Sequence, residues 1–112
     1  MDEYKYVDME AGLGRVRGNS VLFRKMLGMF LASEDFAAFE EALAAKDYPK
    51  AADAAHTIKG FTGNLALTPL FEQSAKLMSQ LRGGGYDEAV LQNYRDILTE
   101  TRAEVEKIIA AS

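Results

Sequence analysis

Cysteine is absent from the chain, and histidine occurs once, as His56. Without cysteine the protein has no disulfide, no thiolate nucleophile and no cysteine ligands for zinc. With one histidine, a metal site made by the protein alone would consist almost entirely of carboxylates. We therefore expect no metal site and no cofactor, and a self-contained hydrolase or metalloenzyme has few residues to work with.

Long apolar runs are also missing, and none approaches the roughly 18 residues that a membrane span requires. The first ten residues, MDEYKYVDME, are acidic and interrupted by charge, unlike a signal peptide. Acidic residues outnumber basic ones by 17 to 13, a net charge of −4, which argues against nucleic acid or an anionic membrane as the main partner. We expect a soluble, cytoplasmic protein.

Sustained alternation of β-branched and polar residues is absent too, so we expect no strands. Breaker and capping residues instead divide the chain into five amphipathic helices, at about 20–32, 34–47, 49–66, 69–82 and 88–110. Residues 1–18 are expected to be irregular, with at most a short helix near Asp8–Gly12. A chain of 112 residues is expected to form one domain, residues 1–112. The short connections predict an all-α antiparallel bundle.

Capping chemistry supports these helix starts. Side chains that can accept hydrogen bonds from the first turn of a helix precede the first, second and last of these helices: Asn19 or Ser20, Ser33 and Asp87. Pro49 suits the first turn of the third helix. Thr68 followed by proline predicts the same arrangement, a cap and then a proline, at the fourth helix.

The only histidine lies in the stretch AAHTIKGFTGN, residues 54–64, where two glycines interrupt a helical pattern. Each glycine in a helix interior costs about 1 kcal/mol relative to alanine. On a helical projection the apolar positions fall on one side, which should face the core, and His56 projects away from them to solvent. These apolar positions are Ala51, Ala54, Ala55, Ile58, Phe61 and Leu65.

Small residues flank His56 on the same strip, with Ala52 one turn before it, Gly60 one turn after and Gly63 two turns after. Small neighbours let another macromolecule approach the ring closely. Lys59, at i+3, can meet an anionic group there. We interpret the glycines as giving access to His56, with close helix–helix packing as the alternative.

A neutral histidine near pH 7 can act as a nucleophile and form covalent phosphoryl intermediates. General acid–base catalysis normally needs a pocket and an orienting partner, and a helix face lined by alanine and glycine is expected to be no pocket. A nucleophile that a partner's active site reaches fits this pattern better. An inert surface histidine is the alternative on spacing alone.

The segment AHTIKG, residues 55–60, resembles the H-x-apolar-K-G signature of histidine phosphotransfer (HPt) domains. Residues 7–30 and 70–82 are similar to the family's N-terminal segment and to the helix that follows its histidine. The resemblance implies a four-helix bundle with an additional short N-terminal helical segment. It also implies a monomeric phosphocarrier of two-component phosphorelays, one that is not an enzyme.

In such a carrier His56 would receive a phosphoryl group from an aspartate of one receiver domain and pass it to another. Lys59 would stabilise the phosphate, and Gly60 would leave room for the receiver's loops. The implied partners are response-regulator receiver domains and a hybrid sensor kinase, and the receiver supplies the aspartate and Mg²⁺. Met1 and the ends of the chain favour a free-standing protein over a piece of such a kinase.

The chain departs from the family pattern at three positions. Phe61 stands where a small residue is usual, and we expect it to fill core space. Ala66 replaces a common glycine. Met78 occupies a place where the family often has glutamate or glutamine, and in some members a glutamine there orients the histidine. Neither Gln73 nor Gln80 is at the matching position.

The segment VLFRKMLGMFL, residues 21–31, is apolar on more than one face. Val21 or Met29 is therefore expected to stay exposed beside His56 as a docking patch. The alternative function is a non-catalytic helical adaptor that binds receiver or kinase domains. His56, Lys59 and Gly60 together argue against it, because a pure adaptor does not require all three.

Overall fold

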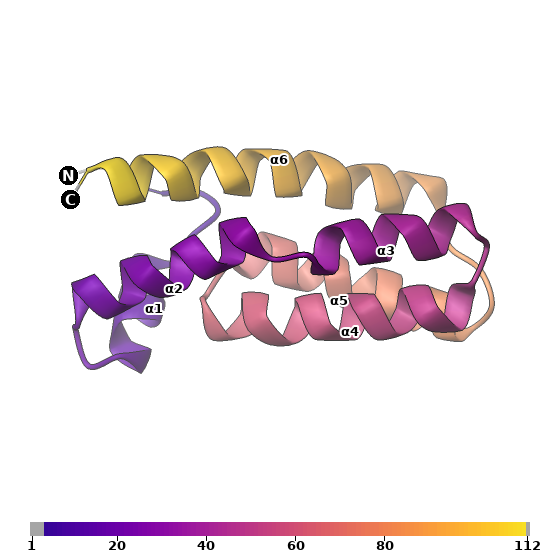
Figure 1. The fold of residues 1–112 in the computed structure, drawn as a ribbon, viewed down its shortest axis with the longest axis horizontal. Helices are drawn as coiled ribbons and strands as arrows, with labels where there is room; N and C mark the ends of the chain where they lie inside the picture. Colours follow the sequence, from indigo (N-terminus) through magenta and orange to yellow (C-terminus); the bar gives the residue numbers. More distant parts are fainter. Residues whose placement is uncertain (1–3, 112) are drawn as a thin grey trace.

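Six helices make up most of the computed structural model, which describes residues 4–111 (Figure 1). They are α1 (Met9–Arg15), α2 (Ser20–Ala32), α3 (Asp35–Ala44), α4 (Tyr48–Asn64), α5 (Thr68–Arg82) and α6 (Glu88–Ala110). No strand occurs within residues 4–111, and no helix there is long and apolar enough to cross a membrane.

The helices form an elongated body of 42 × 21 × 20 Å. Helices α2 and α3 follow one another along one side, α4 and α5 run back and forth beside them, and α6 spans the length of the molecule (Figure 1). Helices α3 to α6 alternate in direction. Helix α2 precedes α3 on the same side of the molecule and runs in the same direction (Figure 1). This confirms the expected all-α antiparallel four-helix bundle with an N-terminal helical addition.

Most helix starts follow the capping residues. The Leu22 N–H donates to the side chain of Asn19 at 3.0 Å, and the Ala89 N–H donates to Asp87 at 2.8 Å. Ser33 Oγ accepts from the Asp35 N–H at 3.2 Å, but Ser33 lies two residues before α3 begins, and Glu34, which directly precedes the helix, provides no side-chain cap. The prediction for Thr68 was wrong, because Leu67 precedes α5 without a side-chain cap and Thr68 is already helical.

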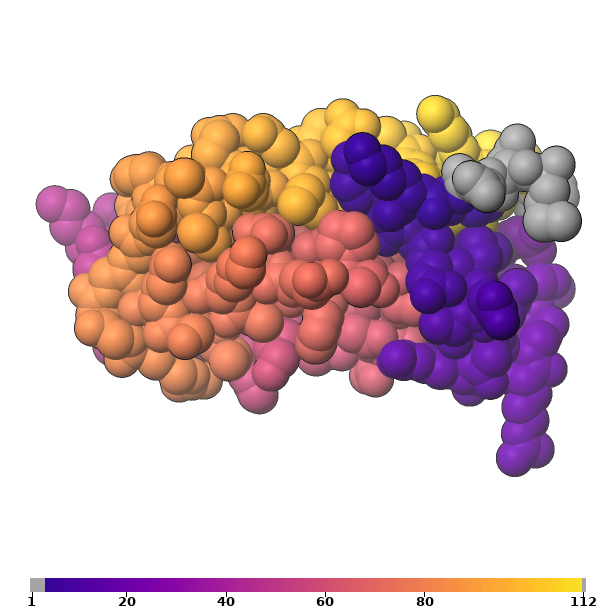
Figure 2. Space-filling model, turned by 180° about the vertical axis from the view of Figure 1, so that it is seen from behind, coloured from indigo at the N-terminus to yellow at the C-terminus, as the bar shows by residue number. Residues whose placement is uncertain are grey.

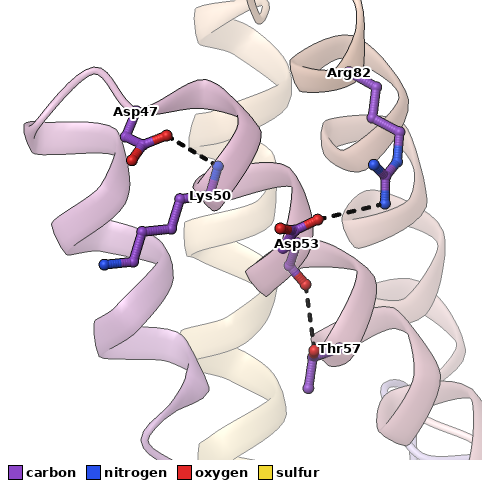
Figure 3. A network of polar contacts seen from close by, with 5 residues as sticks. All are labelled: Asp47, Lys50, Asp53, Thr57 and Arg82. Atoms are coloured by element: carbon purple, nitrogen blue, oxygen red, sulfur yellow. Dashed lines mark hydrogen bonds and ion pairs between the residues drawn. The ribbon is translucent and has the colours of Figure 1, made fainter.

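Helix α4 begins with a cap that the sequence pattern did not single out. Asp47 accepts from the Lys50 N–H at 3.1 Å, and Pro49 occupies the first turn as expected (Figure 3). At its other end Ala66 has a φ of +59°, and the Leu67 N–H returns to the Thr62 carbonyl at 2.9 Å. Ala66 therefore holds the left-handed position that closes a helix and that glycine usually fills.

Helix α1 is longer than expected, since it continues past Gly12 to Arg15. A Cβ at Gly12 would lie 2.4 Å from Cζ of Phe23, which is far too close. This glycine therefore serves the packing of α1 against α2, where the sequence pattern suggested only the end of a short helix.

The segment before α1 is tied to the bundle. Val7 is buried, and the Asp8 N–H donates to the Ala66 carbonyl at 2.9 Å. The backbone N–H groups of Lys5 and Tyr6 donate to the Glu104 carboxylate at 2.7 and 2.6 Å. Figure 2 shows this segment lying across the bundle against α6. The expectation that residues 1–18 are irregular holds for 4–8, while residues 1–3 lie outside the described part.

The buried side of α4 is broader than the predicted stripe. Ala52 and Thr62 are fully buried, whereas Ala54 and Phe61 are half-buried. Helix α4 packs against both α3 and α5, so its core face covers more than one side. The Thr62 hydroxyl donates to the Ile58 carbonyl at 2.7 Å, which satisfies this buried polar group inside the helix.

Phe61 belongs to an aromatic cluster at the junction of α2 and α3. Its ring centroid lies 5.7 Å from that of Phe36 in an edge-to-face arrangement and 6.4 Å from that of Phe30. The guanidinium of Arg102 lies 4.9 Å from the Phe36 ring centroid. Phe61 was expected to fill core space, and it is half-buried and packs against the core.

Candidate functional site

His56 lies near the middle of α4 and is exposed, as the helical projection predicted. Its ring forms no hydrogen bond or ion pair within residues 4–111. Lys59, one turn on, is half-buried, and Gly60 is exposed. A Cβ built at Gly60 would meet nothing within 4 Å, so the space over this turn of the helix is open.

The interpretation of a continuous strip of small residues around His56 is wrong at two positions. Ala52 is fully buried in the core. A Cβ at Gly63 would lie 3.0 Å from Cδ1 of Phe71 on α5, so this glycine permits close helix–helix packing. Access to His56 therefore explains only Gly60.

A surface hollow of about 440 Å³ opens beside His56, contrary to the expectation of no pocket. We call it the His56 hollow. Residues of α1, α4 and the start of α5 form it, including His56, Lys59, Gly60, Arg15, Asn64, Thr68 and Phe71. No carboxylate lines it, so it offers no acidic partner for general acid–base catalysis.

The end of α5 meets α4 one turn before His56. Arg82 Nη2 lies 3.9 Å from the carboxylate of Asp53, and Thr57 Oγ1 donates to the Asp53 carbonyl at 3.2 Å (Figure 3). Both side chains of the ion pair are largely exposed, so it contributes little to stability. The ion pair does hold the carboxylate of Asp53 beside Arg82, and Asp53 does not line the His56 hollow.

The glutamines and methionine considered for orienting the ring make other contacts. Gln80 accepts from the Asp87 N–H at 2.8 Å. Oε1 of Gln73 is buried without a hydrogen-bond partner in the structure, and Met78 packs against the hydrophobic core. In the described chain, therefore, no side chain fixes the orientation of the His56 ring by hydrogen bonding.

The Hpt domain model matches residues 25–111, which is most of the chain and includes all of α3 to α6. The chain belongs to the Hpt domain family. No curated protein and no solved structure matches it. Hpt domains are the histidine phosphotransfer domains of phosphorelays, phosphocarriers that interact with receiver domains and kinases. His56, Lys59 and Gly60 lie within the matched residues, whereas α1 lies outside them.

A second hollow of about 540 Å³ lies between α2, α3 and α4 of the Hpt domain, and Ser33, Glu34 and Asp35 line it together with apolar side chains. Its lining includes Met26, Met29, Phe30, Phe61 and Asn64. Because Asn64 also lines the His56 hollow, the two adjoin there. Met29 is 66% exposed and Val21 76%, so the expected exposure of α2 is confirmed. Of these two residues, only Met29 lines the second hollow.

Arg15 lines the His56 hollow, although the sequence pattern did not single it out. It follows two glycines in a segment that was expected to be irregular beyond Gly12, and nothing in that spacing relates it to α4. The folded Hpt domain brings α1 to the end of α4, where Arg15 Nη1 donates a hydrogen bond to the Gly63 carbonyl. Among the described residues, no group of three or more carboxylate, histidine or cysteine side chains is placed to hold a metal ion.

Proposed function

We propose that this Hpt domain carries a phosphoryl group between receiver-domain aspartates as a phosphohistidine at His56. The observation that carries the proposal is the placement of the chain's single histidine. It is exposed on α4, beside an open hollow free of carboxylates and next to a glycine with no neighbour within 4 Å. A partner's active site can therefore reach this ring.

The transfer step needs only the ring and the receiver. A neutral ring nitrogen of His56 attacks the phosphorus of an aspartyl phosphate on the receiver. The N–P bond forms while the P–O bond to the aspartate breaks, and the aspartate leaves as a carboxylate with that electron pair. In the second step an aspartate of another receiver attacks the phosphorus, and the ring nitrogen leaves with the electrons of the N–P bond.

Lys59 and Gly60 have different roles in this proposal. The Lys59 ammonium, one turn from His56, stabilises the charge of the transferred group electrostatically. Gly60 keeps the space above the ring free for the receiver. The receiver supplies Mg²⁺ and the acceptor carboxylate, so the Hpt domain acts as a carrier and does not catalyse a complete reaction by itself.

A two-receiver relay tests this function. The Hpt domain is mixed with a receiver carrying radiolabelled phosphate, repurified, and mixed with a second, unlabelled receiver and Mg²⁺. We expect label to appear first on the Hpt domain and then on the second receiver, with His56→Gln blocking both transfers. Binding of receivers without transfer of label, across a broad receiver panel, would instead support the non-catalytic adaptor.

A further inference from the structure

Arg15 places a second cation on the His56 hollow. It comes from α1, it is exposed, and it lines the hollow together with His56 and Lys59. Its Nη1 donates to the Gly63 carbonyl, near the last turn of α4. A guanidinium has five N–H donors, and no other hydrogen bond of this side chain is formed within residues 4–111. Most of its donors therefore remain available to a ligand.

The charge of the His56 hollow is opposite to that of the protein as a whole. The chain has a net charge of −4, yet two cationic side chains and no carboxylate line this surface. Asp53, the nearest acidic residue of α4 before His56, faces Arg82 instead. The hollow therefore favours an anionic group, and opposite charge across an interface speeds association and selects the partner.

Geometry separates the two cations. Lys59 is three residues from His56 and lies within one helical turn of the ring. Arg15 is held at Gly63, seven residues from His56, which is about 10 Å along the helix axis. Arg15 is therefore held further along α4 from His56 than Lys59 is. This position suits a contact with the surface of the protein that delivers or receives the phosphoryl group.

We propose that Arg15 is a docking residue that binds a carboxylate of the receiver domain at the far end of the His56 hollow. The inference rests on the proposed function, because it takes the partner to be a receiver with acidic side chains around its reacting aspartate. The family model begins at residue 25, so membership in the family assigns no role to Arg15. Its planar fork is suited to a two-point contact with a carboxylate.

A purely structural role for Arg15 is the competing explanation, because its side chain adds a second donor to the Gly63 carbonyl, which already accepts from the Ala66 N–H at 3.1 Å. Arg17 provides a matched control. It is an exposed arginine two residues further on, and it does not line the His56 hollow. Arg15→Gln and Arg17→Gln therefore remove the same charge at neighbouring positions, and only the first removes it from the hollow.

The experiment measures phosphotransfer from a phosphorylated receiver over a range of receiver concentrations and salt concentrations. We expect Arg15→Gln to raise KM about tenfold with less than a twofold change in the rate at saturating receiver, and to weaken the salt dependence. Arg15→Lys should recover part of the affinity, and Arg17→Gln should match the wild type. Thermal unfolding of each variant reports the structural contribution.

Two results would overturn the docking role. One is equal KM values for Arg15→Gln and Arg17→Gln. The other is a loss of transfer by Arg15→Gln that follows a fall in its melting temperature and that Arg15→Lys does not recover. A wild-type protein that binds the receiver but gains no phosphoryl group would contradict the proposed function instead. In that case the docking role of Arg15 is tested by measuring the affinity of each variant for the receiver. Equal affinities of Arg15→Gln and Arg17→Gln would still refute docking.

Discussion

Gly60 and Gly63 look equivalent in the sequence, but the space around them differs. A side chain at Gly60 would point into solvent, whereas one at Gly63 would press on Phe71. The helical pattern places both residues on the same side of α4 as His56. Only the position of α5, which is a tertiary feature, shows that one of them leaves the surface open and the other lets two helices approach.

Gly60→Leu should separate helix stability from access. Because nothing lies within 4 Å of the added Cβ, we expect helix content and melting temperature to stay the same or rise. Transfer from a receiver should slow about tenfold or more, since the leucine occupies space that the partner needs. Gly60→Ala is the graded control, with up to about 1 kcal/mol more stability and a smaller loss of rate. Circular dichroism and transfer kinetics measure the two effects, and normal transfer by Gly60→Leu would contradict the access argument.

Tyr94 is a fully buried side chain whose hydroxyl has no hydrogen-bond partner in the structure. Burial raises the pKa of Tyr94 well above its usual value, because the charged phenolate is poorly solvated there. The unfolded chain therefore loses this proton first, and stability should fall as the pH rises above about 10.

Tyr94→Phe should remove this loss of stability at alkaline pH. It keeps the aromatic ring, whose centroid lies 5.2 Å from that of Phe39. At pH 7 we expect the free energy of unfolding to stay the same or rise by up to about 1 kcal/mol, since an unpaired buried hydroxyl is removed. Urea denaturation at pH 7 and near pH 10.5 provides both values. A loss of more than about 1 kcal/mol at pH 7 would mean that the hydroxyl is bonded after all.

Helix α2 combines a buried side with an exposed apolar side. Its sequence is apolar on more than one face, which predicts incomplete burial but does not say which residues remain outside. The structure shows that Met29 lines a hollow adjoining that of His56, whereas Val21 is exposed and lines neither hollow. Of the two exposed residues considered for docking on α2, only Met29 therefore remains a candidate.

Met29→Gln should slow transfer from a receiver about fivefold, mainly through a higher KM, because less apolar surface is buried in the complex. Stability should change little, since the side chain is two-thirds exposed. Val21→Thr is the control on the same helix, and its kinetics should match the wild type. Equal rates for all three proteins would remove α2 from the docking surface.

Helix bounds could be predicted well from caps, prolines and glycines, because those signals are local. The five long helices begin and end within about two or three residues of their expected positions. Errors occur where tertiary contacts decide the outcome. Gly12 packs against Phe23 inside α1, Thr68 enters α5 without capping it, and Ala52 is buried by the breadth of the core.

At the scale of the whole molecule, α1 and the segment before it join the bundle through distant contacts. Val7 is buried, Glu104 accepts two backbone N–H groups, and Arg15 reaches Gly63. No sequence pattern indicates these contacts, since they join residues some 50 to 100 positions apart. The His56 hollow depends on them, which explains why the sequence predicts the exposed histidine but not the hollow beside it.

These contacts predict that residues 1–112 unfold as one domain. We expect far-ultraviolet circular dichroism, which follows all helices, and tyrosine fluorescence to report coincident urea transitions. Glu104→Gln weakens the connection to the N-terminal segment and should shift both transitions together. An early separate transition, assigned to α1 by hydrogen exchange, would show that the N-terminal helix is an independent unit.

The central claim is that His56 carries the phosphoryl group, and intact-mass analysis tests it most directly. Wild type and His56→Gln are each incubated with phosphorylated receivers and Mg²⁺. We predict one added acid-labile phosphoryl group on the wild type only, with nearly equal thermal unfolding of the two proteins, because the side chain is exposed. Phosphorylation of His56→Gln, or no gain by a wild type that still binds its receivers, would contradict the claim.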